Sequence, residues 1–215
     1  MRKIISLVFL SLAFAAVAVA VSNEHEYAKL QEKKINYRDW TFRKRGTGEP
    51  VNLRQWAQGK KLVLVVYLAP WCNNWKLEAP VVGRLYDKYK DHGFDVIAVS
   101  NYGTERDQEV YFKDKNVPYT VVVESDTREA RDQTTHYAYR QGTGDARKWG
   151  SPYNVFLVPA KLKQDGDVLT EKAWITNGEL IEKDVEEFIR KRLGLKKEKD
   201  AEKQEVAGEK VASQP

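Results

Sequence analysis

The chain has 215 residues, enough for one domain with a sizeable core and additional tails. Its 36 Lys and Arg residues against 31 Asp and Glu residues give a formal net charge of +5, but the two signs are interspersed. The sequence shows no basic face interleaved with aromatic residues, so this composition argues against nucleic-acid binding.

The N-terminus predicts export. Two basic residues precede an apolar run over residues 4–21, which ends in Ala-Val-Ala, a small-x-small cleavage pattern. We expect a signal peptide over residues 1–20, cleaved after Ala20 or, as a second choice, after Ser22. The run also approaches the ~18–20 apolar residues that span a bilayer, so an uncleaved anchor is the alternative. Either interpretation places the domain in the periplasm or outside the cell, with membrane contact only through an uncleaved segment.

The first predicted elements lead to one strongly apolar strand. In chain order they are a charged lead-in that is loose or helical (23–34), a short strand (37–43), a turn (46–50) and a short helical segment (51–58). Leu62 to Leu68 is a continuous apolar run rich in β-branched residues, with lysines before it and a proline after it. This composition predicts a strand that is covered on both faces.

Helices and strands alternate after that run. Apolar residues at helical spacing predict a helix over 75–89, which Pro80 should kink or divide. The later predicted elements are a strand (94–100), a helix (104–115) with Val110 and Phe112 inward, a strand (120–124), a polar and partly helical segment (125–140), a glycine-containing loop (141–150), two strands (153–158 and 168–176) and an amphipathic helix from Asn177 to Gly194. This order predicts an α/β domain over 35–194, followed by a disordered charged tail over 195–215.

Cys72 is the only cysteine, which excludes an internal disulfide. A lone thiol in an oxidising compartment is reactive, capped, or buried and inert. Cys72 falls between the apolar strand and the following helix, where backbone N–H groups and the helix dipole favour a thiolate. The alternative is a small buried hydrophobic residue beneath Trp71 and Trp75.

The segment that begins at Trp71 reads Trp-Cys-Asn-Asn-Trp-Lys-Leu-Glu-Ala-Pro. It resembles the Trp-Cys-x-x-Cys-x-x-Glu-x-Pro motif of the thioredoxin superfamily, in its exported TlpA/ResA-like redoxin branch, with Trp75 at the position of the second cysteine. The resemblance covers roughly residues 40–193, including the order of elements. It implies a thioredoxin-like three-layer α/β/α fold with a central mixed β-sheet.

The resemblance also implies roles for individual residues. Cys72 would attack a substrate disulfide, and the mixed disulfide would then wait for an external thiol, because Trp75 cannot resolve it. Glu78 matches the family's active-site glutamate, which exchanges a proton with the thiol; a surface glutamate is the alternative. Pro152 resembles the family's cis-proline, which faces the cysteine; a trans proline at the start of a strand is the alternative.

The remaining predicted site residues surround the thiol. Ser151 and Tyr153 would flank it, and Ser151 together with Pro152 would hold the substrate backbone. The aromatic residues Trp71, Trp75, Trp149 and Tyr153 would line a groove for an unfolded peptide or an apolar partner, with Trp71 and Trp75 controlling access.

These residues predict a monothiol thiol–disulfide oxidoreductase that acts through Cys72 on oxidised protein or low-molecular-weight thiol partners. It would need an external dithiol reductant and no cofactor. A redox-inactive peptide-binding module is one alternative. A one-cysteine peroxidase is another, although peroxiredoxins carry Thr or Ser at the position of Ala69. No metal site is predicted, because the three histidines share no ligand spacing, and His136 is expected in a solvated helix.

Overall fold

In a computed structural model, the protein is described over residues 24–196. The signal peptide or anchor predicted over residues 1–20 lies outside these residues, as does the predicted tail apart from its first two positions. Within residues 24–196, none of the helices combines the length and apolar character that crossing a membrane requires.

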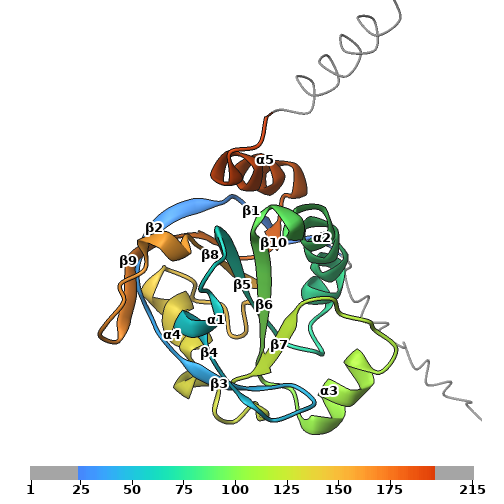
Figure 1. The fold of residues 1–215 in the computed structure, drawn as a ribbon. Coiled ribbons are helices and arrows are strands. Elements are labelled where there is room, and N and C mark those ends of the chain that lie inside the picture. Colours follow the sequence, from blue (N-terminus) through green and yellow to red (C-terminus); the bar gives the residue numbers. More distant parts are fainter. Residues whose placement is uncertain (1–23, 197–215) are drawn as a thin grey trace, which may run out of the picture.

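An eight-stranded mixed sheet forms the centre of the fold (Figure 1). Its spatial order is β2-β9-β8-β5-β6-β7-β3-β4. In chain order the strands are β2 (Gln31–Arg38), β3 (Thr41–Lys44), β4 (Pro50–Asn52), β5 (Leu62–Leu68), β6 (Phe94–Ser100), β7 (Thr120–Val123), β8 (Tyr153–Leu157) and β9 (Val168–Thr176). The central strand β5 pairs in parallel with β6 and antiparallel with β8. Two short strands, β1 (Tyr27–Ala28) and β10 (Glu179–Leu180), form a separate parallel pair.

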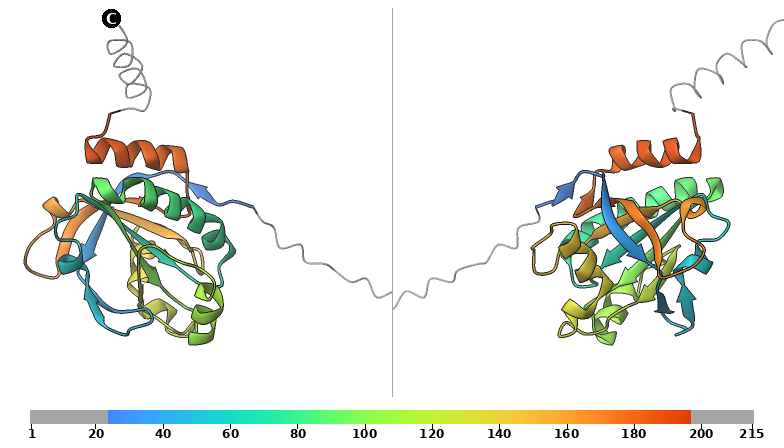
Figure 2. Two further views of the ribbon diagram at one scale, coloured as in Figure 1. Left: turned by 45° about the vertical axis from the view of Figure 1, so that its right-hand side comes forward. Right: turned by 90° about the vertical axis from the view of Figure 1, so that its left-hand side faces the viewer.

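Helices cover both faces of the sheet, as Figure 2 shows from two sides. One hydrophobic core joins α2 (Asn73–Tyr89), α3 (Glu105–Phe112) and α5 (Glu182–Leu193) to the even-numbered side chains of β5. The opposite core joins α1 (Leu53–Trp56) and α4 (Thr135–Gly142) to the odd-numbered side chains. All seven residues of β5 are buried, which confirms the predicted doubly covered strand. The three-layer thioredoxin-like fold class is likewise confirmed.

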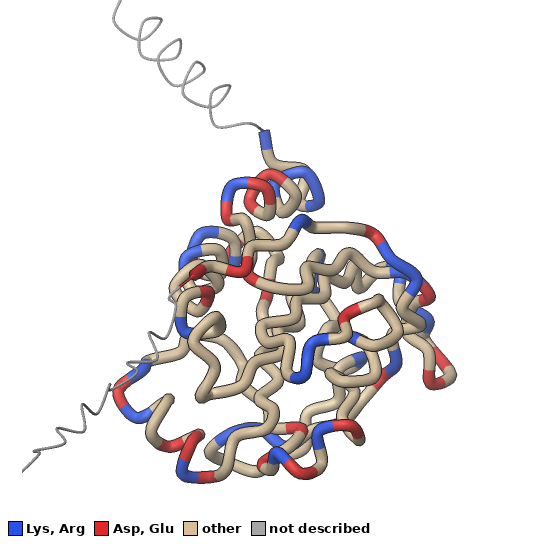
Figure 3. The backbone as a smooth tube through the Cα atoms, turned by 180° about the vertical axis from the view of Figure 1, so that it is seen from behind, with Lys and Arg blue, Asp and Glu red and all other residues tan. Residues whose placement is uncertain are grey.

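The sheet curls, so that its first strands enclose one of these cores. Only residues 39 and 40 separate β2 from β3, yet five other strands lie between them in the spatial order. The chain from β2 to β3 therefore crosses one face of the sheet (Figure 1) and places the buried Tyr37 and Trp40 in the core beneath α4. Basic and acidic residues are interspersed over the exposed segments in Figure 3.

The predicted lead-in over residues 23–34 is wrong, because this segment forms β1 and the first half of β2. The sequence from Gln31 to Arg38 acquires its conformation by antiparallel pairing with β9, whose residues lie at least 130 positions further along the chain. Such a non-local pairing produces little recognisable strand pattern in the sequence of a short charged segment. The folded part consequently begins earlier than the predicted boundary at residue 35, and the strand predicted over 37–43 is divided between β2 and β3.

Three helix predictions also need correction. Helix α2 continues through Pro80 instead of being divided there. Val110 is 71% exposed, and α3 directs Tyr111 and Phe112 inward. Helix α5 begins at Glu182, because the residues after Asn177 first form β10 against β1. Gly194 ends α5, as predicted, and the structure shows it in a left-handed conformation.

Candidate functional site

Cys72 lies at the junction between β5 and α2, as the N-terminal cap residue of the helix. Its side chain is half-buried, and the thiol donates a hydrogen bond to the carbonyl oxygen of Ser151 at 3.2 Å. The Ser151–Pro152 peptide bond is cis, which confirms that prediction. The hydroxyl of Ser151 accepts a hydrogen bond from the backbone N–H of Ala69 at 3.1 Å. The fold therefore brings Cys72, Ser151 and Pro152 together across 79 residues of sequence.

Two half-buried tryptophans stand beside the thiol. Trp71 and Trp149 contact each other edge to face, with ring centroids 5.2 Å apart. The indole N–H of Trp71 donates to the carbonyl oxygen of Tyr102 at 2.8 Å. Tyr102 has a left-handed backbone (φ 61°), a conformation that is costly for a bulky residue and recurs at functional sites. This backbone holds the Trp71 ring in place next to Cys72.

Trp75 and Tyr153 do not line the groove in which the sequence analysis placed them. Trp75 is 1% exposed and packs near Tyr111 in the core under α2, with ring centroids 6.4 Å apart. It lies three residues before Glu78, on the inward face of the helix. Tyr153 is fully buried in the opposite core, and its hydroxyl bonds to Thr143. Neither side chain is positioned to control access to the thiol.

Glu78 is a buried carboxyl group, so the surface-glutamate alternative is wrong. Its Oε2 accepts hydrogen bonds from the backbone N–H of Leu180 at 2.7 Å and from the Asn154 amide at 3.2 Å. Its Oε1 has no hydrogen-bond partner among the described residues. Burial raises the pKa of Glu78 to about 8, opposed by these two hydrogen bonds and supported by the negative charge of Glu179. A carboxyl group with this pKa holds its proton at neutral pH and can release it close to that range.

A second buried carboxylate, Glu179, ties the start of the domain to α2. It accepts hydrogen bonds from the Glu26 backbone N–H and the Asn74 side chain, both at 2.9 Å, and it pairs with His25. Arg147 in turn pairs with the Glu26 carboxylate. The N-terminal segment, the first turn of α2 and the loop before Pro152 are thus fastened together.

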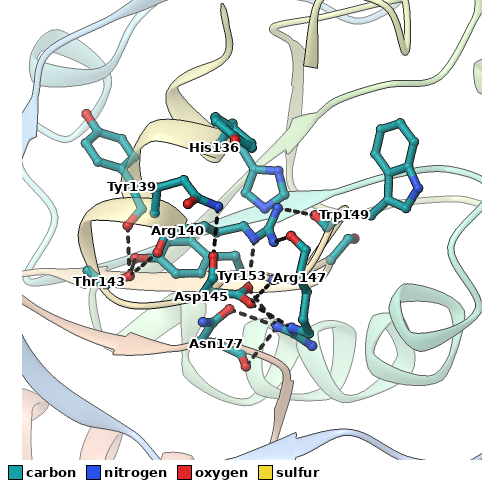
Figure 4. Close-up of polar contacts among 12 residues, drawn as sticks. His136, Tyr139, Arg140, Thr143, Asp145, Arg147, Trp149, Tyr153 and Asn177 are labelled. Carbon is teal, nitrogen blue, oxygen red and sulfur yellow. Dashed lines mark hydrogen bonds and ion pairs between the residues drawn. The ribbon is translucent and has the colours of Figure 1, made fainter. Parts of the chain in front are cut away.

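The loop over residues 143–151 is organised by a buried arginine (Figure 4). Arg140 is fully buried, and its guanidinium donates to the Asp145 carboxylate at 2.8 Å and to the carbonyl oxygens of Trp149 and Arg147. Although burial acts to raise the pKa of Asp145, hydrogen bonds from Arg147 and Arg140 hold that pKa well below its usual range. A permanently ionised pair therefore fixes the course of the backbone that leads to Ser151.

Gly150 lies against this guanidinium in a left-handed conformation (φ 52°), and a Cβ there would overlap Arg140 Nε. Gly150→Ala should therefore displace the ion pair and destabilise the protein by roughly 2–4 kcal/mol. Urea unfolding measures this loss.

Gly144→Ala is the matched control for that substitution. Gly144 is also left-handed (φ 91°) but has open space around it, so its replacement should cost only about 1 kcal/mol. Equal losses for the two variants would show that contact with Arg140 is unimportant.

His136 is buried rather than solvated, contrary to expectation. Its Nδ1 forms a 2.9 Å hydrogen bond with the Tyr102 hydroxyl, and its ring stacks on Tyr67. Burial, reinforced by the positive charge of Arg140, lowers the pKa of His136 to about 3, so the ring is neutral. The sequence signal that was missed is the spacing of four between His136 and Arg140, which places both on the inward face of α4. Over residues 24–196, no group of three or more His, Cys, Asp or Glu side chains is arranged to hold a metal ion.

Comparison with known proteins supports the fold. The chain is similar to solved structures that include a putative thiol:disulfide interchange protein DsbE from Chlorobium tepidum (19% identity over 79% of this chain and 99% of that chain, TM-score 0.51). A thiol:disulfide interchange protein from Bacteroides sp. is also similar (19% identity, 77% of this chain and 93% of that chain, TM-score 0.53). At these identities the likeness establishes the fold. No curated protein matches the chain. The model of the AhpC/TSA family matches residues 18–143, more than half of the chain, so the protein belongs to the AhpC/TSA family of redoxins and has a thioredoxin-like fold.

Proposed function

We propose that the protein is an exported thiol–disulfide oxidoreductase that works with one thiol, that of Cys72. The observation that carries this proposal is the position of the half-buried sulfur, at the start of α2 and within hydrogen-bond distance of the residue before Pro152. Membership of a redoxin family and the names of the structural neighbours support it. The sequence contains no second cysteine that would resolve an intermediate.

The proposed reaction is a series of thiol–disulfide exchanges. The Cys72 thiolate attacks one sulfur of a substrate disulfide, the S–S bond breaks, and the departing thiolate takes up a proton. One thiolate of an external dithiol then attacks the substrate sulfur of the mixed disulfide and releases the Cys72 thiolate. The second thiol of that dithiol displaces the reduced substrate and closes the dithiol's own disulfide, so the dithiol supplies the two electrons. Ser151 and Pro152 would hold the substrate backbone, and Trp71 would border the approach.

We assign Glu78 a part in the proton transfers of this cycle. A buried carboxyl group with a pKa of about 8 is protonated below that pH and can accept or supply a proton near it. Its hydrogen bonds with Asn154 of β8 and Leu180 of β10 fix the carboxyl group on the inward face of the helix that begins at Cys72. Glu78 is thereby a candidate to tune the thiol, not a residue that contacts substrate.

Export through the segment over residues 1–20 is part of the proposal, with retention of that segment as a membrane anchor as its alternative form. The structural neighbours include a secreted disulfide oxidoreductase from Mycobacterium tuberculosis (14% identity, 70% of this chain and 93% of that chain, TM-score 0.50). An oxidising compartment would supply the disulfides on which a thiol exchange protein acts.

Peroxide reduction is less well supported by the site. Peroxiredoxins are expected to carry a Thr or Ser hydroxyl three residues before the reactive cysteine, to bond the peroxide. Here that residue is Ala69, whose side chain is an unreactive methyl group. Its backbone N–H already donates to the Ser151 hydroxyl.

Intact-protein mass spectrometry tests the proposal. The native protein, treated with excess glutathione disulfide near neutral pH, should gain one glutathione adduct that dithiothreitol removes. Cys72→Ser should gain none. The proposal fails if the folded wild-type protein stays unmodified while the same sample reacts in urea. Such a sealed thiol would instead support the peptide-binding module.

A further inference from the structure

Three cationic side chains lie over the two tryptophans beside the thiol. The Arg128 guanidinium is 4.7 Å from the centre of the Trp71 ring. The Arg131 guanidinium and the Lys148 ammonium are 5.6 and 5.4 Å from the Trp149 ring. We refer to these five residues as the cationic rim. Placement of cations on aromatic faces is favourable and holds long, flexible side chains in a defined position.

The cationic rim borders the reactive sulfur. Trp71 immediately precedes Cys72, and Trp149 lies two residues before Ser151, whose carbonyl oxygen accepts the thiol hydrogen bond. The edge-to-face contact between the two tryptophans makes the rim one continuous surface. In Figure 4 the Trp149 indole projects away from the buried Arg140 network to which its backbone is bonded. The backbone of Trp149 is thus anchored, and its half-exposed ring contacts Trp71 and Tyr102.

An open pocket of about 360 Å³ lies at the Trp149 side of this surface, and its lining includes neither Trp71 nor Cys72. It is lined by Arg128, Glu129, Arg131, Asp132, Lys148 and Trp149. The lining contains three cationic side chains against two acidic ones, Glu129 and Asp132. The Glu129 carboxylate accepts a hydrogen bond from the Thr127 hydroxyl. Arg128 is only loosely paired, at 3.8 Å, with Asp107. Lys148 is exposed, and its ammonium forms no hydrogen bond or ion pair among the described residues. Donor groups of Arg128 and Lys148 therefore remain on the rim for an anion.

We propose that the cationic rim selects low-molecular-weight disulfides that carry carboxylates, which the pocket would hold beside Cys72. This inference rests on the proposed exchange activity and names its substrate class. Aromatic rings supply contact area for the carbon skeleton of such a ligand, and the cations bind its carboxylates. Because the charged groups are exposed, they act mainly by raising the rate of productive encounter, and salt screens the effect.

Two aromatic disulfide reagents, one anionic and one neutral, provide the test. 5,5′-Dithiobis(2-nitrobenzoate) carries two carboxylates, whereas 4,4′-dithiodipyridine is neutral near neutral pH. Each releases a coloured thiol when Cys72 attacks it, so stopped-flow absorbance gives both rate constants. In the wild-type protein, the rate constant of the anionic reagent should fall as salt is added, while that of the neutral reagent should stay nearly constant.

Lys148→Glu is the principal variant, because this side chain is exposed. We expect about a tenfold lower rate constant with the anionic reagent and less than about a twofold change with the neutral one. Arg131→Gln is the second variant and should act in the same direction more weakly, since it removes a charge without reversing it. Lys183→Glu, an exposed position on α5, makes the same change of net charge away from the rim and should leave both rate constants within about twofold.

The outcomes separate this inference from the proposed function. If the native thiol reacts with neither reagent, the exchange activity itself is contradicted. If both reagents react and Lys148→Glu affects them equally, Cys72 remains an exchange thiol but the rim does not select anions. An equal effect of Lys148→Glu and Lys183→Glu would attribute the charge dependence to the whole protein and would also overturn the inference.

Discussion

Arg140→Met should destabilise the protein by about 3–5 kcal/mol. The substitution keeps an apolar stem of similar length but leaves the Asp145 carboxylate, 4% exposed, without its buried partner. It also removes the donors to the carbonyl oxygens of Trp149 and Arg147. Asp145 keeps its ion pair with the half-exposed Arg147. Loss of the fully buried partner is nevertheless far more costly than loss of an exposed ion pair, because water cannot replace it. Urea unfolding at pH 7, followed by tryptophan fluorescence, gives the free energy of unfolding.

Arg84→Met supplies the control for the buried pair. Arg84 makes two hydrogen bonds to Glu182, at 2.8 and 2.7 Å, but both side chains are exposed. Its replacement should change the free energy of unfolding by less than about 1 kcal/mol. Similar losses in the two variants would contradict the view that Arg140 organises the loop before Pro152. A faster reaction of Cys72 with a neutral disulfide in Arg140→Met would show that the loop has loosened around the thiol.

Glu78→Gln should make the protein progressively more stable than the wild type as the pH rises from 4.5 towards 8. The pKa of Glu78 is raised from 4.5 to about 8 in the folded protein. The folded state therefore retains a proton that the unfolded state releases across this range, so the stability that Glu78 contributes is present below pH 4.5 and is lost as the pH rises through about 8. Each pKa unit corresponds to about 1.4 kcal/mol, which gives a difference of roughly 3 kcal/mol at pH 7.

Free energies of unfolding for both proteins at several pH values between 5 and 8 test this prediction. Subtraction of the wild-type curve isolates the contribution of Glu78 from those of other groups with a raised pKa. Glu124 is one of these groups, because burial raises its pKa as well. Glu182→Gln is the control, because a hydrogen bond from Arg84 lowers the pKa of that carboxylate and its contribution is already complete near pH 5. A constant difference between Glu78→Gln and wild type over this range would contradict a protonated buried carboxyl group.

Local sequence patterns were sufficient for the elements that depend on local chemistry. The apolar run of β5 defined a buried central strand because each of its side chains meets a hydrophobic core, whichever way it points. Strand β2 was missed because its conformation depends on β9. Helix α5 was extended too far towards the N-terminus because Leu180 and Ile181 fit its apolar period, although Leu180 pairs with Ala28 of β1.

The candidate site was predictable where a motif determines it and unpredictable where the tertiary structure does. The resemblance gave Cys72 and the cis peptide bond before Pro152, and the structure brings them together. It also suggested that Trp75 would control access, but the helical period directs this side chain into the core. The Arg140–Asp145 pair carries no recognisable motif, since neither residue type indicates burial until the partner is known.

The hydrogen bonds from the Glu26 backbone and the Asn74 side chain to Glu179 determine where the chain enters the domain relative to the thiol. Because Asn74 lies two residues after Cys72, the polypeptide enters the folded body at the same end as the reactive sulfur. Any tether on that side, whether a lipid-embedded helix or a preceding module, would orient the thiol towards the tethering surface. Redox partners would then meet it laterally or from within that surface, and tether length would set how large a partner can be admitted.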